Sequence, residues 1–204
     1  MQETLFAPSI AAPQRTVMTM KYEFTIIASG LDPEVDEDFE DRFFEAGCDD
    51  ATLSFQKGVI VLEFNREAES FLEAIAAGYA DTLKAGAHVE RIEPDHLVSL
   101  SDIARRAGLS RAAISLYVKG ERGEDFPAPI ARVTTESPLW NWVDVAKWLY
   151  QHKQGDLEVA LQANIVSAAN TYVWANNHGV TPKTEFASYL RECTVSFEME
   201  LKAA

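Results

Sequence analysis

The sequence has few of the residues from which catalytic and metal-binding sites are built. Its two cysteines, Cys48 and Cys193, lie far apart and form no CxxC pair, which argues against a disulfide framework and favours a reducing compartment. The four histidines are scattered, and none pairs with Cys or Asp at a metal-ligand spacing: His88, His96, His152 and His178. HExxH, GxSxG, P-loop and GxGxxG motifs are absent as well. We therefore expect no catalytic residues, no metal site, no cofactor and no enzymatic activity.

Long hydrophobic runs are also missing. No apolar stretch approaches the ~20 residues that a membrane-spanning helix needs. The first 20 residues have neither the basic start nor the long apolar core of a secretory signal peptide. We interpret residues 1–20 as a flexible N-terminal arm, and we expect a cytoplasmic protein that does not enter the membrane.

Basic side chains are scarce: 18 Lys and Arg residues stand against 32 Asp and Glu residues, for a formal net charge of −14. This balance argues against a protein that coats nucleic acid through bulk charge, because phosphate attraction supplies the nonspecific part of such binding. The charge is unevenly distributed, with −13 over residues 1–95, +2 over residues 96–153 and −3 over residues 154–204. A surface that attracts DNA is therefore expected in the middle segment.

The first segment predicts alternating strands and helices. Strands are expected at residues 21–28, 51–56, 59–64 and 87–92, with a tight turn at Lys57-Gly58 between the second and the third. One helix is expected to begin at Asp32-Pro33 and to stop at Gly47, and another to run from Arg66 to about Leu83. The order βαββαβ is the split βαβ arrangement. Residues 21–95 are therefore predicted to form a ferredoxin-like domain.

Residues 32–41 contain seven acids in ten positions. The run lacks the glycine and the spaced oxygen ligands of a calcium loop, and acids in the first turns of a helix favour its positive end. We therefore interpret it as a solvated helix face. An acidic face that repels DNA from this domain is a second interpretation.

The strongest pattern lies at residues 99–119, which read SLSDIARRAGLSRAAISLYVK. A first helix is expected from about Ser101 to Ala107, with Ser99 or Ser101 as its N-cap, and a second helix is expected to begin at Ser110. Gly108 stands where a sharp turn needs a left-handed residue. The residues expected to face inward are Ile103, Ala104, Ala107, Leu109, Ile114 and either Tyr117 or Val118. This spacing is typical of a helix-turn-helix.

The residues that follow predict a wing. A β-hairpin is expected from Ile130–Thr135 and Leu139–Trp142, with a helix at residues 143–150 after it. The pattern dFPaP…W…DVxxWL is similar to the winged helix-turn-helix of bacterial MerR proteins and phage AlpA/excisionase proteins. The resemblance covers about residues 96–151, and the chain departs from ordinary MerR regulators by placing this module centrally.

In such modules the second helix enters the major groove and its exposed side chains contact base edges. The resemblance carries this role to Ser110, Arg111, Ala112, Ser115 and Lys119. Other residues are better suited to phosphates, which position the protein without specifying a sequence: Ser101, Arg105, Arg106, Arg122 and wing residues Arg132, Thr134 and Thr135. The alternative interpretation is a structural helical hairpin in which these arginines are ordinary solvated charges.

The middle segment also contains three tryptophans. Trp140, Trp142 and Trp148 are predicted to fill the core of the small domain, although aromatic side chains also stack on bases.

Residues 152–204 predict a helical hairpin, with a first helix over about 156–174 and a second one beginning at Thr181-Pro182. These helices either pack on the other domains or form the seam of a homodimer.

The sequence as a whole predicts an α+β protein that binds specific double-stranded DNA, as a transcriptional regulator. Its N-terminal domain is expected to sense a small molecule or to bind a protein, which rests on analogy of fold. Two alternatives stay open. One is a non-enzymatic, antitoxin-like interaction protein whose acidic N-terminal domain binds a partner, and the other is an excisionase-like architectural protein.

Overall fold

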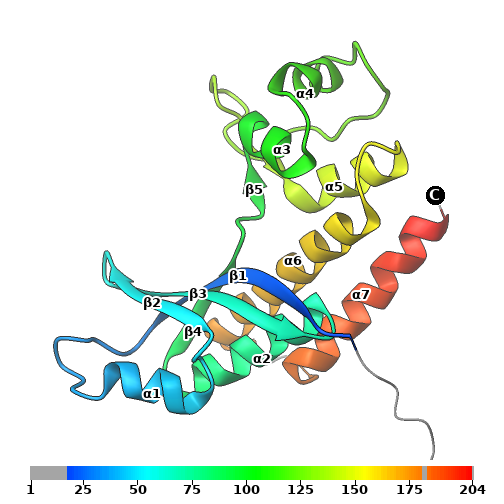
Figure 1. Cartoon of the computed structure of the whole chain (residues 1–204). Helices are drawn as coiled ribbons and strands as arrows, with labels where there is room; N and C mark the ends of the chain where they lie inside the picture. The colour runs from blue at the N-terminus through cyan, green and yellow to red at the C-terminus, as the bar shows by residue number, and fades with distance from the viewer. Residues whose placement is uncertain (1–17, 181–182, 204) are drawn as a thin grey trace, which may run out of the picture.

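The computed structural model describes residues 18–180 and 183–203. Within them the protein is α+β, with seven helices, a four-stranded antiparallel sheet and a small two-stranded sheet (Figure 1). Most of the predicted N-terminal arm, and the helix start expected at Thr181-Pro182, lie outside the described residues.

The four-stranded sheet is built from β1 (Met20–Ser29), β2 (Ala51–Gln56), β3 (Val59–Ala68) and β4 (His88–Glu93). Its strand order is β2-β3-β1-β4, and every neighbouring pair is antiparallel. Alternate residues of β1 point into the core, and Phe24, Ile26 and Ala28 are buried, as the period of a strand requires. The turn expected at Lys57-Gly58 joins β2 to β3.

Helices α1 (Phe39–Ala46) and α2 (Phe71–Lys84) cover one face of this sheet (Figure 1). Helix α2 approaches β1 closely at Gly78, where a Cβ atom would lie 2.9 Å from the Phe24 ring. Any larger residue there would push the helix off the sheet, so glycine determines this packing distance.

Both helices begin later than the sequence pattern predicted. The first was expected to start at Asp32, but α1 begins at Phe39, because the Asp32 side chain accepts the Glu34 N–H at 2.9 Å and closes a local turn instead. The acidic run therefore lies largely in this turn region before the helix.

The second helix was expected from Arg66, but β3 continues to Ala68 and α2 begins at Phe71. Ser70 caps it by accepting the Glu73 N–H at 3.2 Å. In its place on β3, Arg66 is buried and pairs with Asp50 at 2.8 Å and Asp81 at 2.6 Å, and it donates a hydrogen bond to the Gly47 carbonyl. This arginine thus ties β3 to α2 and to the end of α1.

A second, smaller core is formed by β5 (Leu97–Val98), α3 (Leu100–Ala107), α4 (Arg111–Val118), β6 (Trp140–Asn141) and α5 (Trp142–Gln151). The predicted wing hairpin is reduced here to one bridge, between Ala131 and Leu139. Residues 140–141 pair with β5 instead, since the buried Trp140 side chain draws this strand into the core. The expectation of two hairpin strands over 130–142 was therefore wrong in extent.

Helices α6 (Leu157–Asn177) and α7 (Phe186–Ala203) join the two cores. The first half of α6 supplies Ala160 and Ala163 to the smaller core, and its second half packs on the sheet domain. Helix α7 runs back alongside it, with Leu190 in the larger core and Leu201 in the smaller one. The predicted helical hairpin is present, and it packs against both cores.

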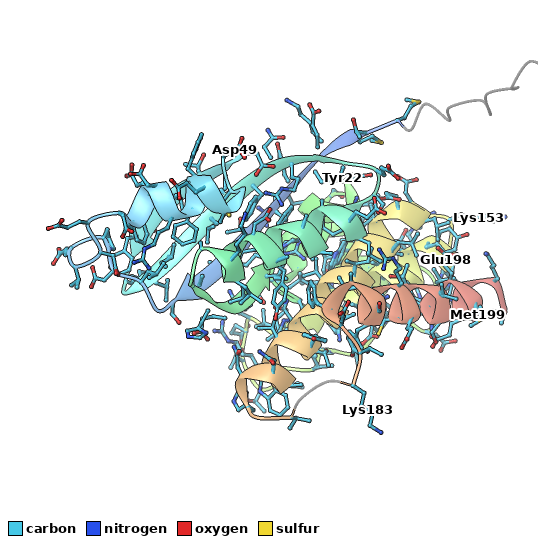
Figure 2. All side chains as sticks on the ribbon, turned by 90° about the horizontal axis from the view of Figure 1, so that it is seen from below. Tyr22, Asp49, Lys153, Lys183, Glu198 and Met199 are labelled. Carbon is cyan, nitrogen blue, oxygen red and sulfur yellow. The ribbon has the colours of Figure 1, made fainter. Side chains whose placement is uncertain are left out.

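The outer side of α7 stays exposed. Seen from below, α7 lies beside α6 and α2 and carries Met199 on its open side (Figure 2). Nothing in the structure tests whether this side forms a homodimer, which remains a prediction.

Strand β4 lies at one edge of the sheet, and α6 covers that edge. The Asn170 amide accepts the Ile92 N–H at 2.8 Å and donates to the Ile92 carbonyl at 2.7 Å, and Asn177 donates to the Val89 carbonyl at 3.0 Å. These amides occupy backbone groups that a neighbouring strand would otherwise pair with.

Replacing Asn170 by alanine is expected to lower the free energy of unfolding by about 1–3 kcal/mol, because the Ile92 N–H and carbonyl groups lose their partner while α6 still covers them. Urea denaturation measures this change. The matched control is Asn176→Ala on the same helix, where the exposed amide makes no hydrogen bond within the described residues, and where a change within about 0.5 kcal/mol is expected. Equal losses in the two variants would contradict the role of Asn170.

Candidate nucleic-acid interface

Helices α3 and α4 meet in a turn with the local chemistry of a helix-turn-helix. Ser99 caps α3 through a reciprocal pair of hydrogen bonds with Asp102, which decides between the two caps that the sequence left open. Gly108 adopts a left-handed conformation at φ 64° and ends α3. Ser110 then caps α4 by accepting the Ala113 N–H at 3.1 Å. The sequence therefore determines both ends of the turn.

Buried apolar residues hold the two helices together. Ile103, Ile114 and Tyr117 are buried, whereas Val118 is exposed, so Tyr117 is the inward residue of the two candidates. Its hydroxyl donates a hydrogen bond to the Gln154 side chain at 3.0 Å, just beyond α5.

The three tryptophans lie in this core as predicted: Trp140, Trp142 and Trp148 are all buried. Two of them also position loops. The Trp140 indole donates to the Pro127 carbonyl at 3.0 Å, and the Trp148 indole donates to the Glu124 carbonyl at 2.9 Å. They anchor the loop that follows α4, so stacking on bases is not their role.

The residues expected to contact bases lie on or beside α4. Ser110, Arg111, Ala112 and Lys119 are exposed, and Ser115 is half-buried. Within the part of the chain that the structure describes, neither Arg111 nor Lys119 forms an ion pair. The two cations of this helix are therefore available to a ligand.

The residues expected to contact phosphates are more dispersed. Ser101 is exposed in the first turn of α3, and Arg105 is 73% exposed while paired with Asp102 at 2.8 Å. The exposed Arg122 guanidinium lies 5.3 Å from the centre of the Tyr117 ring.

The residues that the sequence predicted to form a wing are exposed: Arg132, Thr134 and Thr135. Arg132 has a positive φ of 51°, and the Thr135 hydroxyl donates to its carbonyl at 2.9 Å. The turn is thus organised locally, with the arginine side chain outside.

Arg106 differs from the other candidates. It is half-buried, it donates to the Asp95 carbonyl at 2.8 Å, and its guanidinium lies 5.4 Å from the centre of the Trp142 ring. Burial lowers the pKa of this guanidinium below its usual value, although nearby acids oppose the change. These contacts hold the Arg106 side chain against the last turn of α3. It does not lie on the exposed surface that carries Arg111.

Acidic side chains interrupt the basic surface. Glu121, Glu124 and Asp125 are exposed in the loop after α4, and Glu136 is exposed in the wing. The local charge is therefore mixed, which limits nonspecific attraction to phosphates.

Two other classes of site can be judged from the geometry. Within residues 18–180 and 183–203, no three His, Cys, Asp or Glu side chains lie close enough together to hold a metal ion. Burial raises the pKa of the Cys48 thiol to about 11, with further contributions from the Asp81 and Asp50 carboxylates. This thiol is protonated at neutral pH and is a poor nucleophile.

The sequence pattern missed a cavity between the two cores. Its lining residues come from β1, α2, α3, α5, α6 and the segment before β5. No periodicity or short motif links positions so far apart in the chain, so only the tertiary structure brings them together.

Comparison with known proteins identified no relative of this chain. No protein-family model, no curated protein and no solved structure matches the chain. In the described residues, no helix is both long enough and apolar enough to cross a membrane.

Proposed function

We propose that this protein is a cytoplasmic, sequence-specific DNA-binding protein that acts as a transcriptional regulator and places α4 in the major groove. The observation that carries the proposal is the pair of exposed cations at the two ends of α4, Arg111 in its first turn and Lys119 at its C-cap, which lack ion pairs among the described residues. Arg111 directly follows the Ser110 cap, and the left-handed Gly108 before it supports a helix-turn-helix here.

We also propose that residues 21–95 form a ferredoxin-like domain and that residues 96–151 form a winged helix-turn-helix. The strand order β2-β3-β1-β4, with α1 and α2 on one face, supports the first assignment. The bridge between Ala131 and Leu139 supports a short wing in the second. Sensing or association is then the role of the N-terminal domain.

The proposal divides the exposed arginines between contacts to bases and contacts to phosphates. Arg111 is the residue best suited to a bidentate contact with guanine, which is worth about 1–3 kcal/mol of discrimination. Arg105, Arg122 and Arg132 are suited to phosphates. The net charge of −14 weakens nonspecific association, so base contacts supply a larger share of the affinity. The phosphate contacts of Arg105, Arg122 and Arg132 are what would make binding sensitive to salt.

Replacing Arg111 by alanine is expected to relax base preference at one position of the bound site and to weaken specific binding by about 1–3 kcal/mol. Selection of bound sequences from a random DNA pool tests this. The wild type is expected to enrich a motif, and an inverted repeat would indicate two bound copies.

The matched control is Arg191→Ala, which removes an exposed arginine of α7, a helix that packs on α6 and α2, and is expected to leave the motif unchanged. If the wild type enriches no sequence at low salt, the DNA-binding proposal is wrong. If Arg111→Ala enriches the same motif with the same affinity, α4 does not read the bases.

A second candidate function is binding of a basic protein partner by the N-terminal domain. Its specific support is the acid-rich segment before and within α1, which also contains the exposed apolar side chains of Val35 and Phe44. This antitoxin-like role predicts no enriched DNA motif. An excisionase-like architectural role predicts instead a motif accompanied by bending of the DNA.

A further inference from the structure

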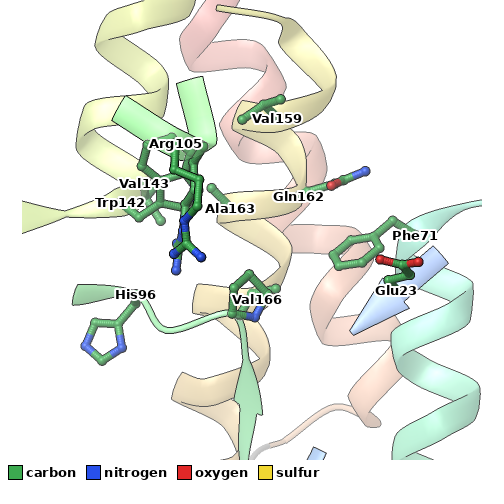
Figure 3. A pocket seen from close by; sticks show the side chains of 12 residues that line it. Glu23, Phe71, His96, Arg105, Trp142, Val143, Val159, Gln162, Ala163 and Val166 are labelled. Atoms are coloured by element: carbon green, nitrogen blue, oxygen red, sulfur yellow. The ribbon is translucent and has the colours of Figure 1, made fainter. Parts of the chain in front are cut away.

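A cavity of about 430 Å³ separates the sheet domain from the helix-turn-helix. Its size falls in the range of small-molecule sites. Figure 3 shows Phe71 and Glu23 on the side of the sheet domain, Trp142 and Arg105 on the other side, and α6 running between them with Val159, Ala163 and Val166. Both halves of the protein thus contribute to one site.

The wall of the cavity is mainly apolar and aromatic. Phe71 comes from α2, Trp142 and Val143 come from α5, and the three small or branched side chains of α6 complete it. Such a surface favours the hydrocarbon or aromatic body of a ligand, because burial of apolar area in water is favourable.

Arg106 supplies a positive charge at this wall that no carboxylate of the described residues pairs with directly, although Asp102, Asp95 and Glu93 act on it from a greater distance. A guanidinium has five N–H donors, and the described residues account for one hydrogen bond from Arg106, to the Asp95 carbonyl. No carboxylate of the described chain lies within ion-pair distance of it. A half-buried cation without a counterion is costly, and an anionic ligand would remove that cost.

The remaining polar groups restrict the ligand further. Arg105 and His96 also line the cavity, but the Arg105 guanidinium is already paired with Asp102. Glu23 lies beside Phe71, on the opposite side from Arg105 and Trp142 (Figure 3). Glu23 would repel a second negative charge on a ligand, so the site favours a ligand with one carboxylate, placed at Arg106.

We propose that this cavity binds a small monocarboxylate with an aromatic or branched apolar body. The carboxylate pairs with Arg106, and the body packs between Trp142 and Phe71. Binding at this site would join α3 of the helix-turn-helix to the sheet domain. The site does not depend on the proposed DNA binding, and it lies apart from the α4 surface.

Isothermal titration calorimetry of the full chain with naphthalene-2-acetate, and with the neutral naphthalene-2-ethanol, tests the proposal. The acid is expected to bind at least about tenfold more tightly than the alcohol, because a charge-assisted pairing is lost in the alcohol. Arg106→Gln is expected to remove this preference, and Gln162→Trp, which fills the cavity from α6, is expected to abolish binding of both. Arg191→Gln is the matched control and is expected to bind like the wild type.

Absence of binding by the wild type, or equal affinity for acid and alcohol, would overturn the proposal. So would an unchanged preference in folded Arg106→Gln. Should that variant fail to show cooperative thermal unfolding, Gln162→Trp decides: retained binding of the acid places the ligand elsewhere and refutes the site. The measurement contains no DNA, so its result is independent of the selection experiment.

Discussion

Replacement of Arg66 by alanine is expected to lower the free energy of unfolding by about 3 kcal/mol. Removing one partner of a buried ion pair costs about 3–5 kcal/mol, because the remaining charge is left without compensation. The lower end applies here, since the Asp50 and Asp81 side chains are 30% and 26% exposed and can be partly hydrated. The Gly47 carbonyl loses its donor in the same variant.

Urea denaturation followed by circular dichroism measures this loss. Arg66→Lys is expected to recover only part of it, because an ammonium cannot form the forked contacts that the guanidinium makes with Asp50. The control is Arg42→Ala, which removes an exposed pair with Asp38 on α1 and is expected to cost about 0.5 kcal/mol or less. Similar losses for Arg66→Ala and Arg42→Ala would show that burial of the network contributes little.

Replacement of Trp140 by alanine is expected to destabilise the smaller core by about 3–5 kcal/mol, as other buried aromatic truncations do. The side chain is 1% exposed and lies against the β5 strand that leads into α3. Its indole also holds the Pro127 carbonyl at 3.0 Å, so the loop after α4 loses an anchor at the same time.

Thermal and urea unfolding of the full chain measure this effect. Trp174→Ala is the matched control, because the Trp174 side chain is 59% exposed at the end of α6, where it stacks on His178. A change within about 0.5 kcal/mol is expected for it. If the two substitutions had equal effects, the aromatic core assigned to residues 96–151 would be wrong.

The helix pair α3–α4 and its turn are the part that local sequence predicted best. Ser99, Gly108 and Ser110 act through hydrogen bonds and backbone preferences that reach at most a few residues, and the buried Ile103, Ile114 and Tyr117 follow from helical period. Such short-range chemistry is visible in one sequence. The same holds for the strands β1, β2 and β4, whose apolar positions recur on one side.

The errors arose where two local patterns competed. Around Asp32 a cap-and-proline pattern predicted a helix, but the same carboxylate forms a turn. Around Arg66 the helical spacing of apolar residues overlapped the end of β3, and pairing with β1 extended the strand to Ala68. In the wing, burial of Trp140 outweighed the expected hairpin pairing. The first outcome is decided within a few residues, whereas the other two depend on pairing with distant segments.

Arg106 shows most clearly what the sequence pattern could not predict, namely the surroundings of a single side chain. In the sequence it is one of two adjacent arginines on an amphipathic helix, with the same assignment to phosphates as Arg105. In the structure Arg105 is largely exposed, whereas Arg106 contacts Asp95 and Trp142 and lines the cavity between the cores. A rotation of about 100° per residue along a helix separates their surroundings, and only the partners of that helix decide which side is open.

The sequence by itself determined the α+β class, the turn at Gly108, the Ser110 cap of α4, the burial of Trp140, Trp142 and Trp148, and the uneven distribution of a net charge of −14. These follow from composition and from interactions within one or two turns of chain. The tertiary structure alone decided the Arg66 network, the closure of β4 by Asn170, the joining of both cores by α6 and α7, and the cavity beside Arg106. The residues that contact one another in these features are far apart in the sequence. Burial in the folded chain, rather than local conformational preference, brings them together.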